Sequence, residues 1–373
     1  MKIIQIVPVI SYGDAIGNDT FALDRVLKKM GFRTQIYAES IGKRIPEGAV
    51  RLMTEWEEPE KEDVILYHMA LSFSHLSKII DAGCRKIGIY HNITPEAFYE
   101  KYNRAAYELC RRGLRQVARL NDTFDYCLAD SEFNRQDLLS YGYRCRIDVL
   151  PVLIPFQDYR QPPDRKIVKK YKGRQTNILF VGRVVPNKKQ EDVIAAFSLY
   201  KKYFDQRAKL ILAGSFNRND EYCRSLERYI QKLGLKKDVI IPGHIRFDEI
   251  LAYYASADLF LCMSEHEGFC VPLVEAMLFR IPIIAYDSSA VGETLGGSGI
   301  LLEQKNDLET AALMDKVIRD QDLRRRMIRG QRARLRDFRP LRIEKLFQRD
   351  LLDFLGAEDT GQGLPAQSAG VSP

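Results

Sequence analysis

Short apolar runs alternate with longer amphipathic stretches along the whole chain. The apolar runs of the first half are KIIQIVPVI (2–10), TQIYAE (34–39), DVILYH (63–68), KIGIYHN (86–92) and DYCLADS (125–131). Those of the second half are NILFVG (177–182), AKLILAG (208–214), DVIIPG (238–243), DLFLCMS (258–264), PIIAYD (282–287) and GILL (299–302). The stretches between them, such as 20–30, 74–82 and a long one ending at 120, favour helices. Strands separated by helices predict right-handed βαβ units, and therefore parallel sheets in an α/β fold.

Length and a proline-rich stretch indicate two domains. A chain of 373 residues exceeds what one hydrophobic core usually organises, and the segment PVLIPFQDYRQPPDRK has no clear periodicity. We therefore expect Rossmann-like domains over 1–155 and 176–338, joined by a linker over 156–175. We also expect a helix over 339–356 that packs back on the first domain, and a tail over 357–373 without order. Ligands of such folds bind in the cleft at the carboxyl ends of the strands.

Cysteine spacing and apolar segments indicate the cellular compartment of the protein. Seven cysteines without CxxC spacing argue against a disulfide framework or a zinc site. The N-terminal MKIIQIVPVI has no basic leader and no cleavage site, and no apolar stretch reaches the roughly 20 residues that span a bilayer. We therefore expect a cytoplasmic protein, attached at most to the inner face of the plasma membrane.

Basic residues gather in two segments, although the formal net charge is only +7. The first segment holds Lys101, Arg104, Arg111, Arg112, Arg115 and Arg119, and the second holds Arg324, Arg325, Arg326, Arg329, Arg332, Arg334, Arg336, Arg339 and Arg342. Such basic helix faces are usually just solvated, and attraction to an anionic membrane surface is the alternative. No aromatic-interleaved basic motif accompanies the charge, so we expect no nucleic-acid partner.

The segment SEHEGFCVPLVEAMLFRIPIIAYD joins a strand, a turn and a helix. Glu267 lies in the turn, and Glu275 lies eight positions later in the helix. A carboxylate in the turn can bind sugar hydroxyls, and a deeper one can accept both hydroxyls of a ribose. Backbone groups at the helix start can bind a sugar hydroxyl or a diphosphate, and they belong to Gly268, Phe269, Cys270 and Val271. The alternative is that both glutamates are ordinary surface charges.

A second segment, NILFVGRVVPNKKQEDVIAAF, supplies cations at a strand end. Gly182 permits a tight passage of the chain, and Arg183 and Lys188 would project into the cleft. Two fixed cations stabilise a leaving diphosphate more in the transition state than in the ground state. A surface salt bridge is the alternative for either residue. The only D-x-D tripeptide that could hold a metal is 320–322, and we interpret it as surface charge, so no metal is expected.

These segments resemble the large family of retaining glycosyltransferases with the GT-B fold, family 4 in the usual classification. The resemblance covers nearly the whole chain and rests on E-x7-E from Glu267 to Glu275, the following EAM and IPIIA, the later Gly292-Glu293, and G-R-x4-K from Gly182 to Lys188. It implies two Rossmann-like domains with parallel sheets facing a central cleft, the first on the acceptor side and the second binding the nucleotide sugar. Cys270 replaces the glycine that is usual in the family, and we expect its side chain to narrow the sugar pocket.

The resemblance also assigns residues of the first domain. His91 ends a strand on the opposite wall of the cleft, and the family has a histidine there that contacts the donor sugar or supports the reaction centre. The loop SYGDAIGND lacks GxGxxG, and in related enzymes it closes over the phosphates and the acceptor. Candidates on this side are Gly13, Asp14, Gly17, the helix-capping Ser131 and the strand-ending His68. Both histidines could instead be structural.

Together these features predict a metal-independent, retaining hexosyltransferase of glycan or polysaccharide biosynthesis. The catalytic candidates are Arg183, Lys188, Glu267 and His91. No carboxylate outside the donor-binding pair is placed as a nucleophile, so we expect front-face attack, with the departing phosphate taking the acceptor proton. A sugar-nucleotide epimerase and a catalytically silent nucleotide-sugar-binding protein of the same fold are the alternatives.

The substrates are less specified. The nucleobase should rest on backbone around His244 and Ile245, which carries no side-chain specificity. The segment YHNITP resembles bacterial mannosyl- and rhamnosyltransferases of polysaccharide assembly, so GDP-mannose is the preferred donor and a UDP-hexose the second choice. We expect a saccharide or lipid-linked saccharide as acceptor, and no cofactor beyond the nucleotide sugar.

Overall fold

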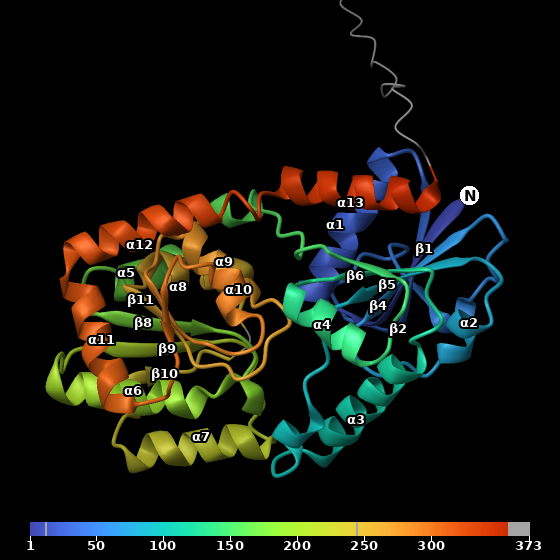
Figure 1. Cartoon of the computed structure of the whole chain (residues 1–373). Coiled ribbons are helices and arrows are strands. Elements are labelled where there is room, and N and C mark those ends of the chain that lie inside the picture. Colours follow the sequence, from blue (N-terminus) through green and yellow to red (C-terminus); the bar gives the residue numbers. More distant parts are fainter. Residues whose placement is uncertain (12, 244, 357–373) are drawn as a thin grey trace, which may run out of the picture.

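Two all-parallel sheets form the two halves of the molecule (Figure 1). This computed structural model describes residues 1–11, 13–243 and 245–356, so the tail predicted over 357–373 lies outside the described residues. The strand orders are β3-β2-β1-β4-β5-β6-β7 and β10-β9-β8-β11-β12-β13. Each sheet changes direction beside its first strand, which is the doubly wound order of Rossmann-like domains. The predicted α/β class with two parallel sheets is confirmed.

The first half contains seven strands and the helices between them. The strands are β1 (Lys2–Ile10), β2 (Arg33–Ile41), β3 (Arg51–Leu52), β4 (Val64–Met69), β5 (Arg85–Tyr90), β6 (Tyr126–Ala129) and β7 (Arg146–Val149). The helices are α1 (Ala15–Lys29), α2 (Leu76–Ile80), α3 (Arg104–Arg119) and α4 (Glu132–Ser140), with short 3-10 helices η1 (Met53–Glu55) and η2 (Glu96–Tyr99).

The second half repeats the arrangement. Its strands are β8 (Asn177–Val181), β9 (Lys209–Ala213), β10 (Val239–Ile240), β11 (Leu259–Cys262), β12 (Ile283–Tyr286) and β13 (Ile300–Leu302). Its helices are α5 (Arg165–Tyr171), α6 (Gln190–Tyr203), α7 (Glu221–Lys232), α8 (Phe247–Ser256), α9 (Val271–Leu278), α10 (Val291–Leu295), α11 (Asp307–Arg319), α12 (Gln321–Arg334) and α13 (Pro340–Leu355), with η3 (Asp158–Arg160) and η4 (Pro186–Lys188).

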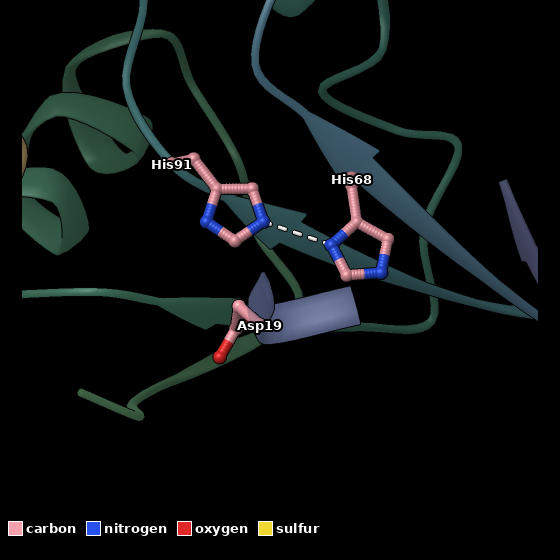
Figure 2. Close-up of side chains that lie close together, drawn as sticks. All are labelled: Asp19, His68 and His91. Atoms are coloured by element: carbon pink, nitrogen blue, oxygen red, sulfur yellow. Dashed lines mark hydrogen bonds between the residues drawn. The ribbon is translucent and has the colours of Figure 1, made fainter. Parts of the chain in front are cut away.

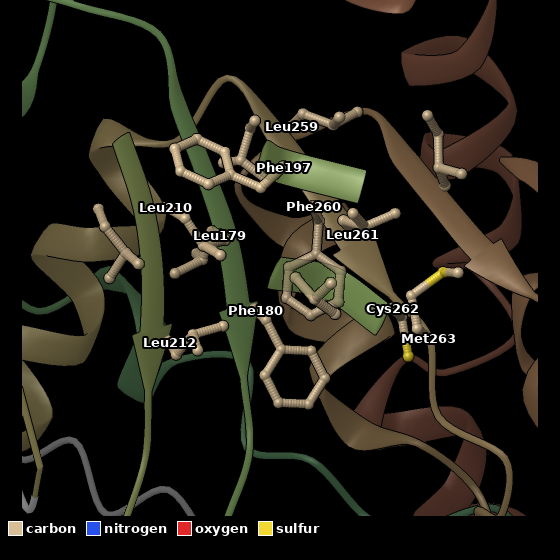
Figure 3. Close-up of a cluster of buried hydrophobic side chains, with 14 of the residues drawn as sticks. Leu179, Phe180, Phe197, Leu210, Leu212, Leu259, Phe260, Leu261, Cys262 and Met263 are labelled. Atoms are coloured by element: carbon tan, nitrogen blue, oxygen red, sulfur yellow. The ribbon is translucent and has the colours of Figure 1, made fainter. Parts of the chain in front are cut away.

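Helices cover both faces of each sheet, so the central strands, such as β4 and β11, are buried along their whole length instead of on alternate residues. Figure 3 shows this core in the second half, where β8, β9 and β11 meet α6. Leu179, Leu210 and Leu261 are fully buried there. No helix in the described part of the chain has the length and apolar character needed to cross a membrane.

Several helices begin at a short polar side chain that accepts a hydrogen bond from the backbone. These caps are Asn103 (α3), Ser131 (α4), Asp164 (α5), Asp220 (α7), Asn306 (α11) and Asp320 (α12). A cap satisfies one of the N–H groups that the first helical turn leaves unpaired. Asp320 and Asp322 form the D-x-D tripeptide, and Asp322 pairs with Arg325 at 2.5 Å, so both carboxylates have structural partners.

The last helix, α13, leaves the second half and lies against α1 of the first (Figure 1). Its buried residues Ile343, Phe347 and Leu351 join the core of β1, β4 and α1. Gly356 ends the helix in the left-handed conformation (φ 76°), which costs glycine little. The chain therefore passes between the two halves twice.

Three local expectations were wrong. The helix expected from 20 begins at Ala15, so Gly17 lies in α1 and not in the preceding loop. A Cβ at Gly17 would lie 2.6 Å from the Ser11 carbonyl oxygen, which explains the glycine as a close contact between α1 and β1. The segment expected as linker contains α5, whose Tyr171 packs on Tyr253 of α8. Strands β3 and β7, which lie at the two edges of the first sheet, were not predicted.

Candidate functional site

The carboxyl ends of β8 and β11 lie side by side, because these two strands are neighbours in the second sheet. The loop after β8 carries Arg183 and Lys188, and the loop after β11 carries Glu267. This is the switch point of the sheet, where open α/β sheets bind their ligands. Gly214 lets β9 approach the same place, since a Cβ there would lie 1.9 Å from the Gly182 carbonyl oxygen.

Lys188 and Glu267 form a direct ion pair. Nζ of Lys188 lies 2.5 Å from Oε2 of Glu267, and the two side chains are 17% and 9% exposed. The Glu267 N–H donates to Ser289 Oγ at 2.8 Å, which fixes the turn that presents the carboxylate. A charged hydrogen-bonded pair this close to solvent can exchange partners when a ligand arrives. One cation and one hydroxyl acceptor are therefore available at the same point.

Arg183 is exposed and faces the first half of the molecule. Burial raises the pKa of Tyr99 and the pKa of Cys110, the latter to about 11, and the positive charge of Arg183 partly offsets both shifts. Tyr99 and Cys110 belong to η2 and α3, across the cleft from β8. Arg183 thus lies over the gap between the two halves.

Glu275 lies in the second turn of α9 with both oxygens already bonded to protein. Tyr159 Oη donates to Oε1 at 2.5 Å, and Tyr254 Oη donates to Oε2 at 2.5 Å. Burial raises the pKa of Glu275, and the two tyrosine hydrogen bonds act in the opposite direction. Tyr159 comes from η3 and packs edge-on against Phe247 of α8. A ribose would have to share these oxygens or displace Tyr159, so the ribose role of Glu275 stays a prediction.

Cys270 is the N-cap of α9 and adopts a left-handed conformation (φ 71°). Its side chain is 5% exposed and packs into the core of the second half. Its Sγ lies within 4.8 Å of Cys262 Sγ and of a Glu267 carboxylate oxygen. The thiol is buried next to Glu267, so any effect of Cys270 on the sugar pocket would have to pass through that carboxylate, and the expected narrowing of the pocket stays a prediction.

At the start of α9 the backbone is available for a ligand, whereas the Phe269 side chain is not. The N–H groups of Phe269, Cys270 and Val271 have no hydrogen-bond acceptor among the described residues. The Phe269 ring, by contrast, is buried and meets Phe338 edge-on, with ring centroids 5.4 Å apart. These N–H groups therefore fit the predicted anion or hydroxyl site, and the Phe269 side chain does not contribute to it.

The loop of residues 264–270, which is predicted to bind the donor and is called the donor loop below, touches the first half directly. A Cβ on Gly268 would lie 2.6 Å from the His91 carbonyl oxygen, so only glycine permits this approach. Ser131 Oγ donates to the Gly268 carbonyl at 2.7 Å while it accepts from the Asn134 N–H. The helix-capping Ser131 is thus also a contact between the two halves.

Two further contacts close the same seam. His266 Nε2 lies 2.8 Å from Asn92 Oδ1, and the carboxylate of Glu293 accepts from the N–H groups of Glu132 (2.8 Å) and Phe133 (3.3 Å). The Glu293 carboxylate thereby sits at the N-terminus of α4, where the helix dipole favours a negative charge. Burial lowers the pKa of His266 to about 4, so this histidine is neutral at pH 7.

His91 lies just after β5, and both of its ring nitrogens are bonded within the protein. Nδ1 lies 2.9 Å from Asp130 Oδ2, and Nε2 lies 2.8 Å from His68 Nδ1. Figure 2 shows the two rings pointing at one another with Asp19 beside them. The His91 side chain is 1% exposed. In this conformation the ring cannot reach a donor sugar, so the expected direct contact of the imidazole with the sugar is wrong. Any role of His91 must be indirect, through the residues that it contacts.

His68 is fully buried, with 0% exposure. It therefore cannot contact an acceptor, and its placement there was wrong. Its nitrogens, with those of His91 and a carboxylate oxygen of Asp19, lie within 4.8 Å of one another. The two facing nitrogens are 2.8 Å apart, whereas two histidines on a tetrahedral zinc ion would be separated by about 3.3 Å. The two nitrogens therefore lie at hydrogen-bond distance, closer together than two ligands of one zinc ion.

The remaining candidates differ in accessibility. Asp14 and Gly13 are exposed in the loop after β1, and the charge of Asp14 contributes to the raised pKa of His91. Asp14 is therefore an exposed charge near His91. Ile245 is partly buried against the core of the second half, and His244 lies outside the described residues.

Sequence reasoning missed Gln5, Asp19, Asp130 and His266, and it gave Glu293 no role beyond the Gly292-Glu293 motif. Gln5 had a signal, because it is the single polar residue inside the run IIQIVPVI (3–10). Asp130 follows a buried strand, as His91 does, and could have been found by the same rule. Asp19 and the contact of His266 with Asn92 had no local signal, since their partners lie far away in the sequence.

Comparisons with known proteins agree with this geometry. Residues 162–334 match the family described as "Glycosyl transferases group 1". A GDP-mannose-dependent alpha-(1-6)-phosphatidylinositol monomannoside mannosyltransferase of Mycobacterium tuberculosis (strain CDC 1551 / Oshkosh) is 24% identical over 219 residues, which are 55% of this chain and 56% of that protein. The O-antigen chain mannosyltransferase B of Escherichia coli is 28% identical over 200 residues, 50% of each chain. This chain thus spans about half the length of these relatives.

Solved structures share the whole fold. Anabaena HepE in complex with UDP and glucose superposes with a TM-score of 0.74 at 18% identity, covering 94% of this chain and 99% of that one. Sucrose-phosphate synthase from Thermosynechococcus elongatus has a TM-score of 0.74 at 15% identity, covering 96% and 100%. At such identities the likeness concerns the fold alone, and the predicted GT-B architecture is confirmed.

Proposed function

We propose that this chain transfers a hexose from a nucleotide-diphosphate sugar to a saccharide acceptor, with retention of anomeric configuration and without a metal. The match of residues 162–334 to glycosyl transferases group 1 supports this proposal. The observation that carries the proposal is the Lys188–Glu267 pair, 2.5 Å apart at the switch point of the second sheet. A cation and a carboxylate at one point can bind the two parts of such a donor, its diphosphate and its sugar.

In the proposed reaction, Lys188 and Arg183 bind the diphosphate. Arrival of the phosphate releases Glu267 from Lys188, and the freed carboxylate accepts hydrogen bonds from the donor sugar. Charge builds up on the departing phosphate as the glycosidic bond breaks, so the two cations stabilise the transition state more than the bound donor. The acceptor hydroxyl attacks from the same face, and its proton passes to the departing phosphate oxygen.

The first half of the molecule lies opposite Glu267 and is proposed to form the other side of the active site. His91 anchors the end of β5, next to Asn92, which contacts His266 one residue before Glu267. Asp14 is exposed on the same side and is proposed to contact the acceptor. Neither residue is proposed as a nucleophile.

We further propose GDP-mannose as the donor, since relatives are named as mannosyltransferases and one of them as GDP-mannose-dependent. Calorimetric titration with GDP, UDP and dTDP tests the donor, and GDP is expected to bind at least 10-fold more tightly than the others. GMP is the matched control: loss of one phosphate should weaken binding at least ~10-fold if Arg183 and Lys188 hold the diphosphate. Tighter binding of UDP would contradict GDP-mannose as the donor but not the proposed hexose transfer.

Turnover separates transfer from its alternatives. Release of nucleoside diphosphate from a nucleotide sugar only when a saccharide is added supports transfer. Conversion of the nucleotide sugar to its epimer without release indicates an epimerase, and binding without any turnover indicates a silent binding protein. Failure of all three nucleotides to bind would remove the proposal.

The proposed acceptor can also be lipid-linked, because α3 presents an exposed basic face. Arg112, Arg115 and Arg119 are exposed along it. Each basic residue near an anionic surface is worth about 1 kcal/mol, so reversing all three to glutamate should weaken binding to phosphatidylglycerol vesicles at low salt on the order of 100-fold. Reversal of Arg325, Arg326 and Arg329 on α12, which are also exposed, is the matched control. If the unaltered protein does not float with such vesicles, the membrane part of the proposal is wrong.

A further inference from the structure

Four buried polar side chains form one hydrogen-bonded line across the first sheet. Gln5 of β1, His68 of β4, His91 after β5 and Asp130 after β6 are 0%, 0%, 8% and 5% exposed. The links are 3.0 Å (Gln5–His68), 2.8 Å (His68–His91) and 2.9 Å (His91–Asp130). Buried polar groups are costly unless every one is bonded, and this line is bonded from end to end.

The donor and the acceptor of each hydrogen bond follow from the groups at the two ends of the line, Gln5 and Asp130. Gln5 Nε2 donates to the Thr20 carbonyl at 3.2 Å, so the amide oxygen is the atom that faces His68. An amide oxygen only accepts, and His68 Nε2 must therefore carry the hydrogen. A neutral His68 then has a lone pair on Nδ1, and His91 Nε2 must donate to it. At the other end the Asp130 carboxylate also accepts, so His91 Nδ1 donates too.

His91 consequently carries a hydrogen on each ring nitrogen. The surrounding charges agree, although burial acts against them: Asp130, Asp19 of α1 and Asp14 before α1 together raise the pKa of His91 above its usual value. Burial, and then the charge of His91, lower the pKa of His68, so the added proton does not move there. Burial raises the pKa of Asp19 to about 7, and its carboxyl also accepts from the Leu153 N–H.

We infer that Gln5 and His68 are positioning residues, which hold His91 doubly protonated and thereby fix the end of β5 against the donor loop. The consequence of this anchoring is visible at the seam. The His91 carbonyl oxygen meets Gly268, and the next residue, Asn92, is in the left-handed conformation (φ 70°) and bonds both His266 and Asn134. The link from this line to catalysis rests on the proposed function, whereas the protonation of His91 does not.

Gln5→Met tests the inference, because methionine keeps the length of the side chain and removes the acceptor. His68 is then free to carry its hydrogen on Nδ1 and to donate to His91 Nε2. His91 no longer needs its second proton, so its pKa is expected to fall by roughly one unit or more. Activity that requires charged His91 should be lost at correspondingly lower pH, since deprotonation would occur earlier as the pH rises.

The readout is long-range 1H–15N spectroscopy of the full-length protein with labelled histidine, which distinguishes the two tautomers and the charged ring without any substrate. The chain has five histidines, and His91→Gln and His68→Gln spectra assign the two signals. In the unaltered protein at pH 7.5, His91 is expected to be doubly protonated and His68 to be the Nε2–H tautomer. In Gln5→Met, His68 should be the Nδ1–H tautomer.

Gln331→Leu is the matched control, because Gln331 is also fully buried and donates to a backbone carbonyl, in the second half of the molecule. It should reduce stability without changing either histidine signal or the pH profile. A neutral His91 at pH 7.5, or histidine signals unchanged by Gln5→Met, would overturn the inference. If the histidine signals are as expected but the pH dependence of activity does not change in Gln5→Met, the double protonation of His91 stands and its link to the reaction is wrong.

Discussion

Arg183→Ala is expected to lower kcat on the order of 100- to 1000-fold, the range seen when one fixed charge or donor is removed from a transition state. Arg183 is exposed and lies over the gap between the two halves, so its removal leaves no buried group unpaired. Unfolding temperature should therefore change little. KM for the nucleotide sugar should rise much less than kcat falls, because the charge on the departing phosphate develops mainly in the transition state.

The effect is measured by steady-state release of nucleoside diphosphate, once donor and acceptor are known. Arg183→Lys keeps the charge but not the bidentate geometry, and we expect it to restore only part of the rate. Arg218→Ala is the control, since Arg218 is 83% exposed and pairs only loosely with Glu227, at 3.5 Å. Turnover of Arg183→Ala within a few-fold of the unaltered protein would show that this arginine does not act on the diphosphate.

Lys188→Ala is expected to combine a comparable loss of kcat with a loss of stability. Lys188 pairs with Glu267, whose side chain is only 9% exposed. Removal of one partner leaves the other charge poorly solvated, which for a largely buried pair costs about 2 kcal/mol or more. We therefore expect a lower unfolding temperature for Lys188→Ala than for Arg183→Ala.

A double-mutant cycle separates the two effects of Lys188. In Lys188→Ala/Glu267→Gln, no unpaired carboxylate remains, so stability should recover relative to Lys188→Ala alone. Activity should not recover, because both the cation for the diphosphate and the carboxylate for the sugar are then missing. Recovery of turnover in the double variant would mean that the pair is purely structural.

The strand-end motifs could be predicted because their chemistry is local. The runs before Arg183 and Glu267 identify buried strands, and parallel strands bring their carboxyl ends to one edge. It follows from the sequence alone that these residues share a sheet edge. That the two strands are direct neighbours was not predicted, and the strand order of the structure shows it.

Contacts between the two halves could not be predicted in the same way. The pairing of His266 with Asn92 joins residues 174 positions apart, and that of Glu293 with the N–H of Glu132 joins residues 161 positions apart. Neither periodicity nor propensity carries information about such distant pairs. The tyrosine partners of Glu275 were missed for a related reason, because Tyr159 lies in a segment that had been interpreted only as linker.

The two passages of the chain between the halves define how the cleft can open. Val152 and Ile154 of the first passage pack with Phe338 of the second in one small apolar cluster. Two covalent crossings held together in this way act as a single hinge, so relative motion is restricted largely to rotation about one axis near that cluster. The seam at Gly268 and His91 is joined by other contacts, and opening must break these while the hinge cluster stays packed. Because Phe338 also packs on Phe269 at the start of α9, mutations at Phe338 should alter both the opening of the two halves and the position of the α9 N-terminus.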